Sequence, residues 1–170
     1  MEPRVYKAPE TLPFMADGLP FDQTGTLLNK SVFLAGSIEM GKAPDWQSIV
    51  TPDLLALGWS VFNPRRDDWD SSWVQSIHNV QFREQVEWEL DAMDIAERVL
   101  MYFAPGTQSP ITLLELGLMA SENPVQEPFL WVVCPEGFWR RGNVEIVCAR
   151  HGVPFFDNLL DAMRDFSKDA

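Results

Sequence analysis

One acidic residue of this chain stands among apolar residues in a segment that predicts the start of a helix. Glu115 lies within residues 111–118, where isoleucine and leucine side chains surround it. Ser109 can accept a backbone N–H as the N-cap, and Pro110 suits the first helical position because its missing N–H costs nothing there. Such an acid either turns outward to water, as most glutamates do, or faces a cleft in which a carboxylate is needed.

A cleft would give this carboxylate a chemical task. An acid near a helix N-terminus stays ionised and could attack an electron-poor carbon, such as the anomeric C1′ of a nucleoside. A second acid could orient the sugar or move a proton to the departing base. The strongest predicted helix, 81–96, carries several acids, among them Glu89 and Asp91. Most of these acids are expected on a solvated helix face.

Segments typical of strands and of helices alternate along the rest of the chain. The predicted strands are 31–35, 59–62, 98–103, 129–134 and 153–156, and the predicted helices are 44–58, 81–96, a segment from 109, 143–150 and 157–166. This alternation predicts an α/β fold with a five-stranded parallel sheet and helices on both faces. Residues 1–29 predict an irregular N-terminal arm, and residues 30–170 predict a single domain.

The unusual loops all follow predicted strands. Ligands of parallel α/β sheets bind beyond the carboxyl ends of the strands. In this chain those ends are residues 36–37, 63–66, 104–109 and 135–141. Gly36 would let a ligand approach the backbone closely. The pairs Arg65-Arg66 and Arg140-Arg141 suit a phosphate or a solvated loop equally well, and Asn143 is expected to cap the next helix.

Composition and charge exclude several classes of function. Of the 170 residues, 46% are hydrophobic and 12% are aromatic, which excludes general disorder. The net charge of −12 argues against binding to a nucleic acid polymer or to an anionic membrane surface. No apolar run is long enough to span a membrane, and the N-terminus lacks the order of a signal peptide.

The sequence predicts neither a cofactor nor a metal. Phosphate-loop, dinucleotide and nucleophile-elbow motifs are missing, and His78 and His151 are too isolated for a zinc site. Cys134 and Cys148 fit no metal spacing and no disulfide framework, so we expect buried thiols and a cytoplasmic location.

Several of these segments together resemble a known family. In their order and spacing they are similar to the nucleoside 2-deoxyribosyltransferase superfamily, in its nucleoside 2-deoxyribosyltransferase-like branch, over about residues 31–156. The matching segments are 32–38, 45–47, 63–69, 85–90, 109–118 and 137–145. The resemblance implies a flavodoxin-like or Rossmann-like sheet, a homodimer or higher homo-oligomer whose subunits complete each other's sites, and a nucleoside or nucleotide substrate.

The resemblance also implies roles for individual residues. Glu115 matches the family's nucleophile, which forms a covalent glycosyl–enzyme intermediate that a free base or water then resolves. Glu89 matches an acid that helps to hold the sugar, with Asp91 as the alternative in a shifted register. The segment Gly36-Ser37 matches a loop that wraps the substrate. Asn63 and Arg65 fall near the base or the 5′ end.

Two positions depart from the family pattern. Ser109 is the nearest match to an aspartate that protonates or binds the base, and Phe33 stands at or close to a tyrosine. Ser109 cannot do acid–base work near neutral pH. Asp67, Asp68 and Gln108 are candidates to replace the missing acid.

Three functional hypotheses follow. The first is N-glycosyl transfer or hydrolysis on a nucleoside or nucleoside monophosphate, with Glu115 as nucleophile. The second is a nucleotide-binding or sensor module that has kept the pocket and lost the chemistry, which Ser109 and Phe33 favour. The third is an oligomer interface at the strand-end loops, suggested by the aromatic residues Trp69, Trp73, Phe138 and Trp139.

Overall fold

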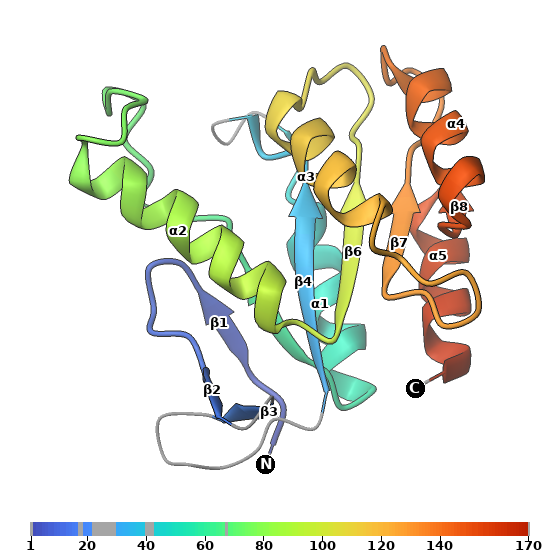
Figure 1. Ribbon diagram of the computed structural model, residues 1–170, viewed down its shortest axis with the longest axis horizontal. Coiled ribbons are helices and arrows are strands. Elements are labelled where there is room, and N and C mark those ends of the chain that lie inside the picture. The colour runs from blue at the N-terminus through green and yellow to red at the C-terminus, as the bar shows by residue number, and fades with distance from the viewer. Residues whose placement is uncertain (1, 17–18, 22–29, 40–42, 67, 170) are drawn as a thin grey trace. The chain divides into compact units, whose positions relative to one another are not determined.

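Short parallel strands form the main sheet of the computed structural model, which describes residues 2–16, 19–21, 30–39, 43–66 and 68–169 (Figure 1). In spatial order the strands of this sheet are β1 (Val5–Lys7), β5 (Ser60–Asn63), β4 (Ser31–Gly36), β6 (Arg98–Tyr102), β7 (Leu130–Val133) and β8 (Phe155–Phe156). Strands β1 and β4 both pair with β5 in parallel, and β7 pairs in parallel with β6 and β8. The predicted α/β fold is confirmed.

The sheet has one strand more than the five that the sequence predicts. The additional strand, β1, comes from the N-terminal arm that we expected to be irregular, and Val5 pairs with Val61. Tyr6 is buried in this strand and its ring packs 5.4 Å from that of Phe62. The arm also contains β2 (Phe14–Ala16) and β3 (Leu19–Phe21), which form a separate antiparallel pair.

The helices begin and end close to their predicted positions. They are α1 (Trp46–Ala56), α2 (Val80–Ile95), α3 (Pro110–Ala120), α4 (Arg141–His151) and α5 (Leu159–Phe166), followed by a 3-10 turn, η2 (Ser167–Asp169). Asn143 does not cap α4, because the helix begins two residues earlier and Arg140 is its N-cap. None of the helices in the described part of the chain is long and apolar enough to span a membrane.

The chain divides into two compact units. The first consists of residues 1–33 and 47–97, and the second of residues 34–46 and 98–170, so that β4 contributes residues to both. The first unit buries Leu54, Trp59 and Phe62. In the second unit Trp131 and Phe166 pack edge to face with their ring centres 5.1 Å apart. Figure 1 shows β6 and β7 of this unit side by side with their carboxyl ends together.

Candidate active site

Three hydroxyl side chains meet at the strand ends of the second unit. The Oγ atoms of Ser37 and Ser109 lie 2.5 Å apart, and Thr107 Oγ1 lies 3.0 Å from the first and 2.9 Å from the second. We call these three residues the hydroxyl cluster. Thr107 donates its proton to the Ala104 carbonyl oxygen at 2.8 Å, and Ser37 Oγ accepts from the Ala104 N–H at 2.8 Å. The cluster therefore fixes the loop between β6 and α3.

Gly36 brings two backbones together immediately before this cluster. Its φ of +147° lies in the region that favours glycine, and a Cβ atom there would lie 2.4 Å from the carbonyl oxygen of Tyr102. The next residue, Ser37, donates its N–H to that same oxygen at 2.9 Å. The sequence predicted close approach of a ligand at Gly36, but in this structure the group that approaches is the backbone of β6.

Glu39 holds the start of α3, a role that nothing in the sequence indicated. Its Oε1 atom accepts the N–H groups of Gln108 at 2.9 Å and of Ser109 at 2.7 Å. Ser109 is the N-cap residue, but it adopts a left-handed conformation with φ 43° and its side chain makes no capping bond. The prediction that the Ser109 hydroxyl caps this helix is therefore wrong, because that hydroxyl is engaged in the hydroxyl cluster while a distant carboxylate takes the N–H groups.

Helix α3 buries two polar side chains beside Leu116 and Ala120, and it exposes several large apolar ones. Thr112 and Glu115 are both buried, and Glu115 is only 8% exposed. By contrast, the exposed fractions on the outer side are 59% for Ile111, 61% for Leu114 and 53% for Leu118. A buried carboxyl group together with three exposed large apolar side chains is unusual for a helix that only stabilises a core. Of the two alternatives for Glu115, the structure excludes the one in which its side chain faces bulk water.

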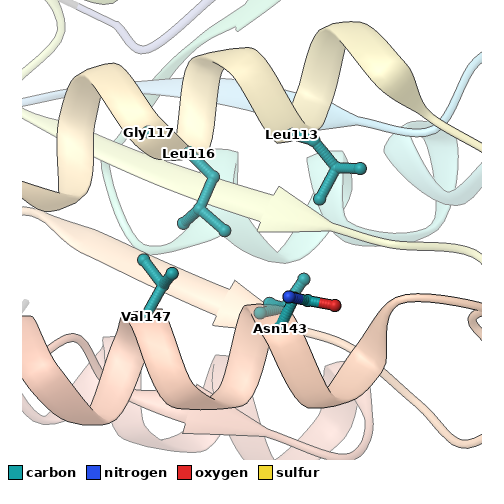
Figure 2. Close-up of a pocket in the computed structure, with 6 residues that line it drawn as sticks. Leu113, Leu116, Gly117, Asn143 and Val147 are labelled. Atoms are coloured by element: carbon teal, nitrogen blue, oxygen red, sulfur yellow. The ribbon is translucent and has the colours of Figure 1, made fainter.

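A shallow apolar groove lies between α3 and α4. Figure 2 shows Leu116 of α3 and Val147 of α4 pointing toward one another across it. Its volume is about 100 Å³, well below the range of about 300–1,000 Å³ typical of small-molecule sites. The residues that line it are Leu113, Leu116, Gly117, Asn143, Val144 and Val147. The size and lining of this groove do not suit a nucleoside.

In the first unit, α2 carries an acid with an unusual proton affinity. The buried side chain of Gln85 donates through Nε2 to the Pro64 carbonyl oxygen at 2.9 Å and to Glu89 Oε1 at 2.7 Å. Burial raises the pKa of Glu89 to about 7, against the opposing effect of the Gln85 hydrogen bond. Glu89 is half-buried, whereas Asp91 is exposed. Glu89 is thus linked to the loop that follows β5 through the carboxamide of Gln85.

That loop is closed by local hydrogen bonds. Asn63 is buried and its Oδ1 accepts the N–H of Arg65 at 3.0 Å. Arg66 donates from Nε and Nη2 to the two carboxylate oxygens of Asp68, each at 2.9 Å, and its guanidinium lies 5.0 Å from the ring centre of Trp73. Arg66 is therefore committed to the loop itself. Its hydrogen bond lowers the pKa of Asp68, while Asp67 lies outside the described residues.

Two aromatic residues singled out in the sequence lie in the core. The ring of Phe33, expected at the substrate, is 0% exposed in β4, so it offers no surface to a ligand in this structure. Phe138, expected at the surface, is buried and its ring centre lies 4.9 Å from that of Phe103. Trp139 is exposed, and its Nε1 donates to the Gln108 carbonyl oxygen at 3.0 Å.

The described residues contain no group of three or more His, Cys, Asp or Glu side chains that could hold a metal ion. Cys134 and Cys148 are free and buried, as predicted. Burial raises their pKa values to about 11 and about 12, which keeps both thiols protonated and unreactive near neutral pH.

Fold and site together define an α/β protein whose adjoining helices and loops near the strand ends carry the carboxyl groups of Glu39, Glu89 and Glu115. The chain belongs to the nucleoside 2-deoxyribosyltransferase-like family, whose sequence model matches residues 29–138. The match includes the hydroxyl cluster, Glu89 and Glu115. Membership suggests a glycosyl-transfer enzyme with a small-molecule nucleoside substrate. No curated protein matches the chain.

Proposed function

We propose that this protein transfers or hydrolyses the N-glycosidic bond of a nucleoside or nucleoside monophosphate through a covalent glycosyl ester on Glu115. The observation that carries the proposal is the orientation of α3, which buries Glu115 and Thr112 while it exposes three large apolar side chains. A carboxyl group that faces inward at the carboxyl ends of the strands suits a nucleophile that must be presented to a substrate. The family of the chain supports the same chemistry.

The proposed reaction has two displacements. In the first, a carboxylate oxygen of Glu115 forms a bond to C1′ of the sugar as the bond from C1′ to the base nitrogen breaks. The electron pair of that bond leaves with the base, which takes up a proton. In the second, a nitrogen of an acceptor base or the oxygen of water forms a bond to C1′ as the bond from C1′ to Glu115 breaks. The Glu115 carboxylate leaves, and the proton that the acceptor loses returns to the acid that protonated the first base.

We assign the proton of the first displacement to Glu89. With a pKa of about 7, this carboxyl is partly protonated near neutral pH and can both give and regain a proton. Asp68 is less suitable, because its pKa is lowered by Arg66. Ser109 and Gln108 carry no acidic group. Holding the sugar, the role implied by the family, is compatible with this assignment.

The test is incubation with a panel of nucleosides and nucleoside monophosphates, followed by mass analysis for free base and for a glycosyl adduct on the protein. We expect the wild type to release base. Glu115→Gln and Glu115→Ala should lose both signals while they remain folded. Glu122→Gln changes an exposed glutamate just beyond α3 and should keep both signals. A wild type that cleaves nothing across the panel would refute the proposed function.

The second candidate function is a binding module without turnover. It is favoured by Ser109, whose hydroxyl is engaged with Ser37 at 2.5 Å where the family pattern has an acid. A thermal-shift screen separates the two functions, because a binding module would be stabilised by nucleosides or nucleotides that it leaves intact.

We further propose that the protein is a homodimer or higher homo-oligomer that buries the outer row of α3. Ile111, Leu114 and Leu118 recur at helical spacing and are each more than half exposed, and an exposed apolar row of this kind is typical of an interface. Leu114→Glu should lower the molecular mass measured by light scattering. Ile49→Glu, at an equally exposed position of α1, should not.

We also propose a cytoplasmic location. Two free, buried thiols are compatible with a reducing compartment, and fractionation of cells that produce the protein tests the proposal.

A further inference from the structure

A buried glutamine connects Glu89 to the loop that follows β5. Gln85 lies one turn before Glu89 on α2 and is 3% exposed. Its single carboxamide nitrogen donates to two acceptors, the Pro64 carbonyl oxygen at 2.9 Å and Glu89 Oε1 at 2.7 Å. A carboxamide nitrogen has two N–H groups, so both of them are used.

The orientation of this carboxamide is fixed by its partners. The carbonyl oxygen of Pro64 can only accept a hydrogen bond, so it requires the nitrogen of Gln85 and not the oxygen. Rotating the amide by half a turn would place its oxygen against the Pro64 carbonyl and against Glu89. Gln85 Nε2 must therefore face Glu89 Oε1.

This orientation determines which oxygen of Glu89 carries a proton. A proton on Oε1 would make that oxygen a poorer acceptor and weaken the 2.7 Å hydrogen bond, whereas a proton on Oε2 leaves it intact. We propose that Gln85 is a positioning residue that keeps the transferable proton of Glu89 on Oε2 and ties that carboxyl to the strand-end loop. This inference rests on the proposed function, in which Glu89 supplies a proton to the departing base.

The cost of the arrangement supports a functional origin. The Oε1 atom of Gln85 is buried and has no hydrogen-bond partner among the residues that the structure describes. An unpaired buried acceptor is destabilising, and an apolar side chain of similar length would avoid it. Methionine would avoid this cost, but it would remove the donor of both the Pro64 carbonyl oxygen and Glu89 Oε1.

The first variant to test is Gln85→Met, which keeps the length of the side chain and removes both N–H groups. We expect kcat on the nucleoside that the wild type cleaves to fall by about 10²-fold, with KM changed by less than about threefold, because the loss falls on proton transfer. Gln81→Met is the matched control, one turn earlier on the same helix and exposed. A Gln85→Met protein with wild-type kcat would overturn the inference.

A second readout needs no activity. The pKa of Glu89 can be followed by NMR of carboxyl-labelled glutamate, with the signal assigned by its loss in Glu89→Gln. Gln85 donates to the charged form and lowers the pKa, so Gln85→Met should raise it, by about 1. The other glutamates of α2, Glu84 and Glu87, are exposed and serve as internal references. An unchanged pKa would contradict the inference.

The two readouts distinguish failure of the inference from failure of the proposed function. If the wild type cleaves no nucleoside but Gln85→Met raises the pKa, the proposed function fails and the hydrogen bond stands. If Gln85→Met does not fold, Gln85→Glu replaces it with a side chain of the same shape. That variant places an oxygen against Glu89, so it should raise the pKa of Glu89 and lower kcat, and wild-type values for both would overturn the inference.

Discussion

The loops that follow β5 and β6 are both held by side-chain hydrogen bonds, but the side chains that hold them differ. The loop after β6 is held by hydroxyl groups and by Glu39, whose Oε1 accepts two backbone N–H groups. The loop after β5 is held through the amide of Gln85, which donates one hydrogen bond to Glu89. Glu39 therefore accepts two backbone N–H groups at a helix start, whereas Glu89 is linked to its loop only through Gln85, accepts one neutral donor and is desolvated.

The surroundings of two acids in the first unit shift their pKa values in opposite directions. Burial with a single neutral donor leaves Glu89 with a pKa of about 7, whereas the guanidinium of Arg66 lowers the pKa of Asp68 nearby in the sequence. Acids whose environments separate their pKa values can divide the work of proton donor and permanent carboxylate. Composition alone does not reveal such a division.

The largest effect is expected from Glu89→Gln, which tests the difference between Glu89 and Asp68. Removing the proposed proton donor should lower kcat/KM on the cleaved nucleoside by about 10²–10⁴-fold. In the wild type, activity should fall as pH rises through about 7, because Glu89 must be protonated in the role that we propose for it. That alkaline limb should be missing from the variant. Asp68→Asn is the control, and a loss as large as that of Glu89→Gln would reverse the two assignments.

The next largest effect concerns the backbone contact between Gly36 and Tyr102, beside the loop that follows β6. Gly36→Ala would place a Cβ atom 2.4 Å from the Tyr102 carbonyl oxygen at a φ of +147°, and neither backbone can give way without disturbing the sheet. We expect a loss of about 2–4 kcal/mol in the free energy of unfolding, measured with urea. Gly142→Ala, in α4 with open space around its Cβ position, should be neutral or stabilising. Equal stability of both variants would contradict this account.

The elements that the sequence predicted are those set by local chemistry. Runs of apolar residues marked β4 to β8, and Pro110 marked the first residue of α3. Strand β1 was missed because its three residues carry no pattern of their own and form a strand only by pairing with β5. A short segment of this kind is decided by its partner rather than by its own propensity.

The contacts of the candidate site depend on residues far apart in the sequence. Glu39 meets Ser109 across 70 positions, so no local pattern links them. The raised pKa of Glu89 arises from burial, which helical periodicity does not report. Glu115 was identified by its apolar neighbours and its family resemblance, yet its orientation was undecided until α3 proved to bury Glu115 and to expose Leu114 and Leu118.

A smaller effect is expected on the pH dependence of the free energy of unfolding, through the raised pKa of Glu89. The pKa of Glu89 in the folded protein lies above its ordinary value, so the folded state binds this proton more tightly than the unfolded state does. The resulting stabilisation is fully present below about pH 4.5 and is lost as pH rises through about 7. Glu89→Gln should remove this stabilisation, on the order of 2 kcal/mol, from the difference between the free energies of unfolding at acidic and at alkaline pH. Parallel curves for wild type and variant would refute it.

The smallest effect is expected at Glu39, because its carboxylate restrains one helix end at a half-buried position. Glu39→Ala leaves the N–H groups of Gln108 and Ser109 without their acceptor and should cost about 1–2 kcal/mol, as loss of a helix cap does. Glu39→Gln keeps an acceptor oxygen and should lose less, about 0.5–1 kcal/mol. Glu122→Ala, exposed beyond the other end of α3, should be silent in the same thermal unfolding experiment. If alanine at position 39 were equally silent, the hydroxyl cluster alone would hold this loop, and the two loops would not differ in their use of a carboxylate.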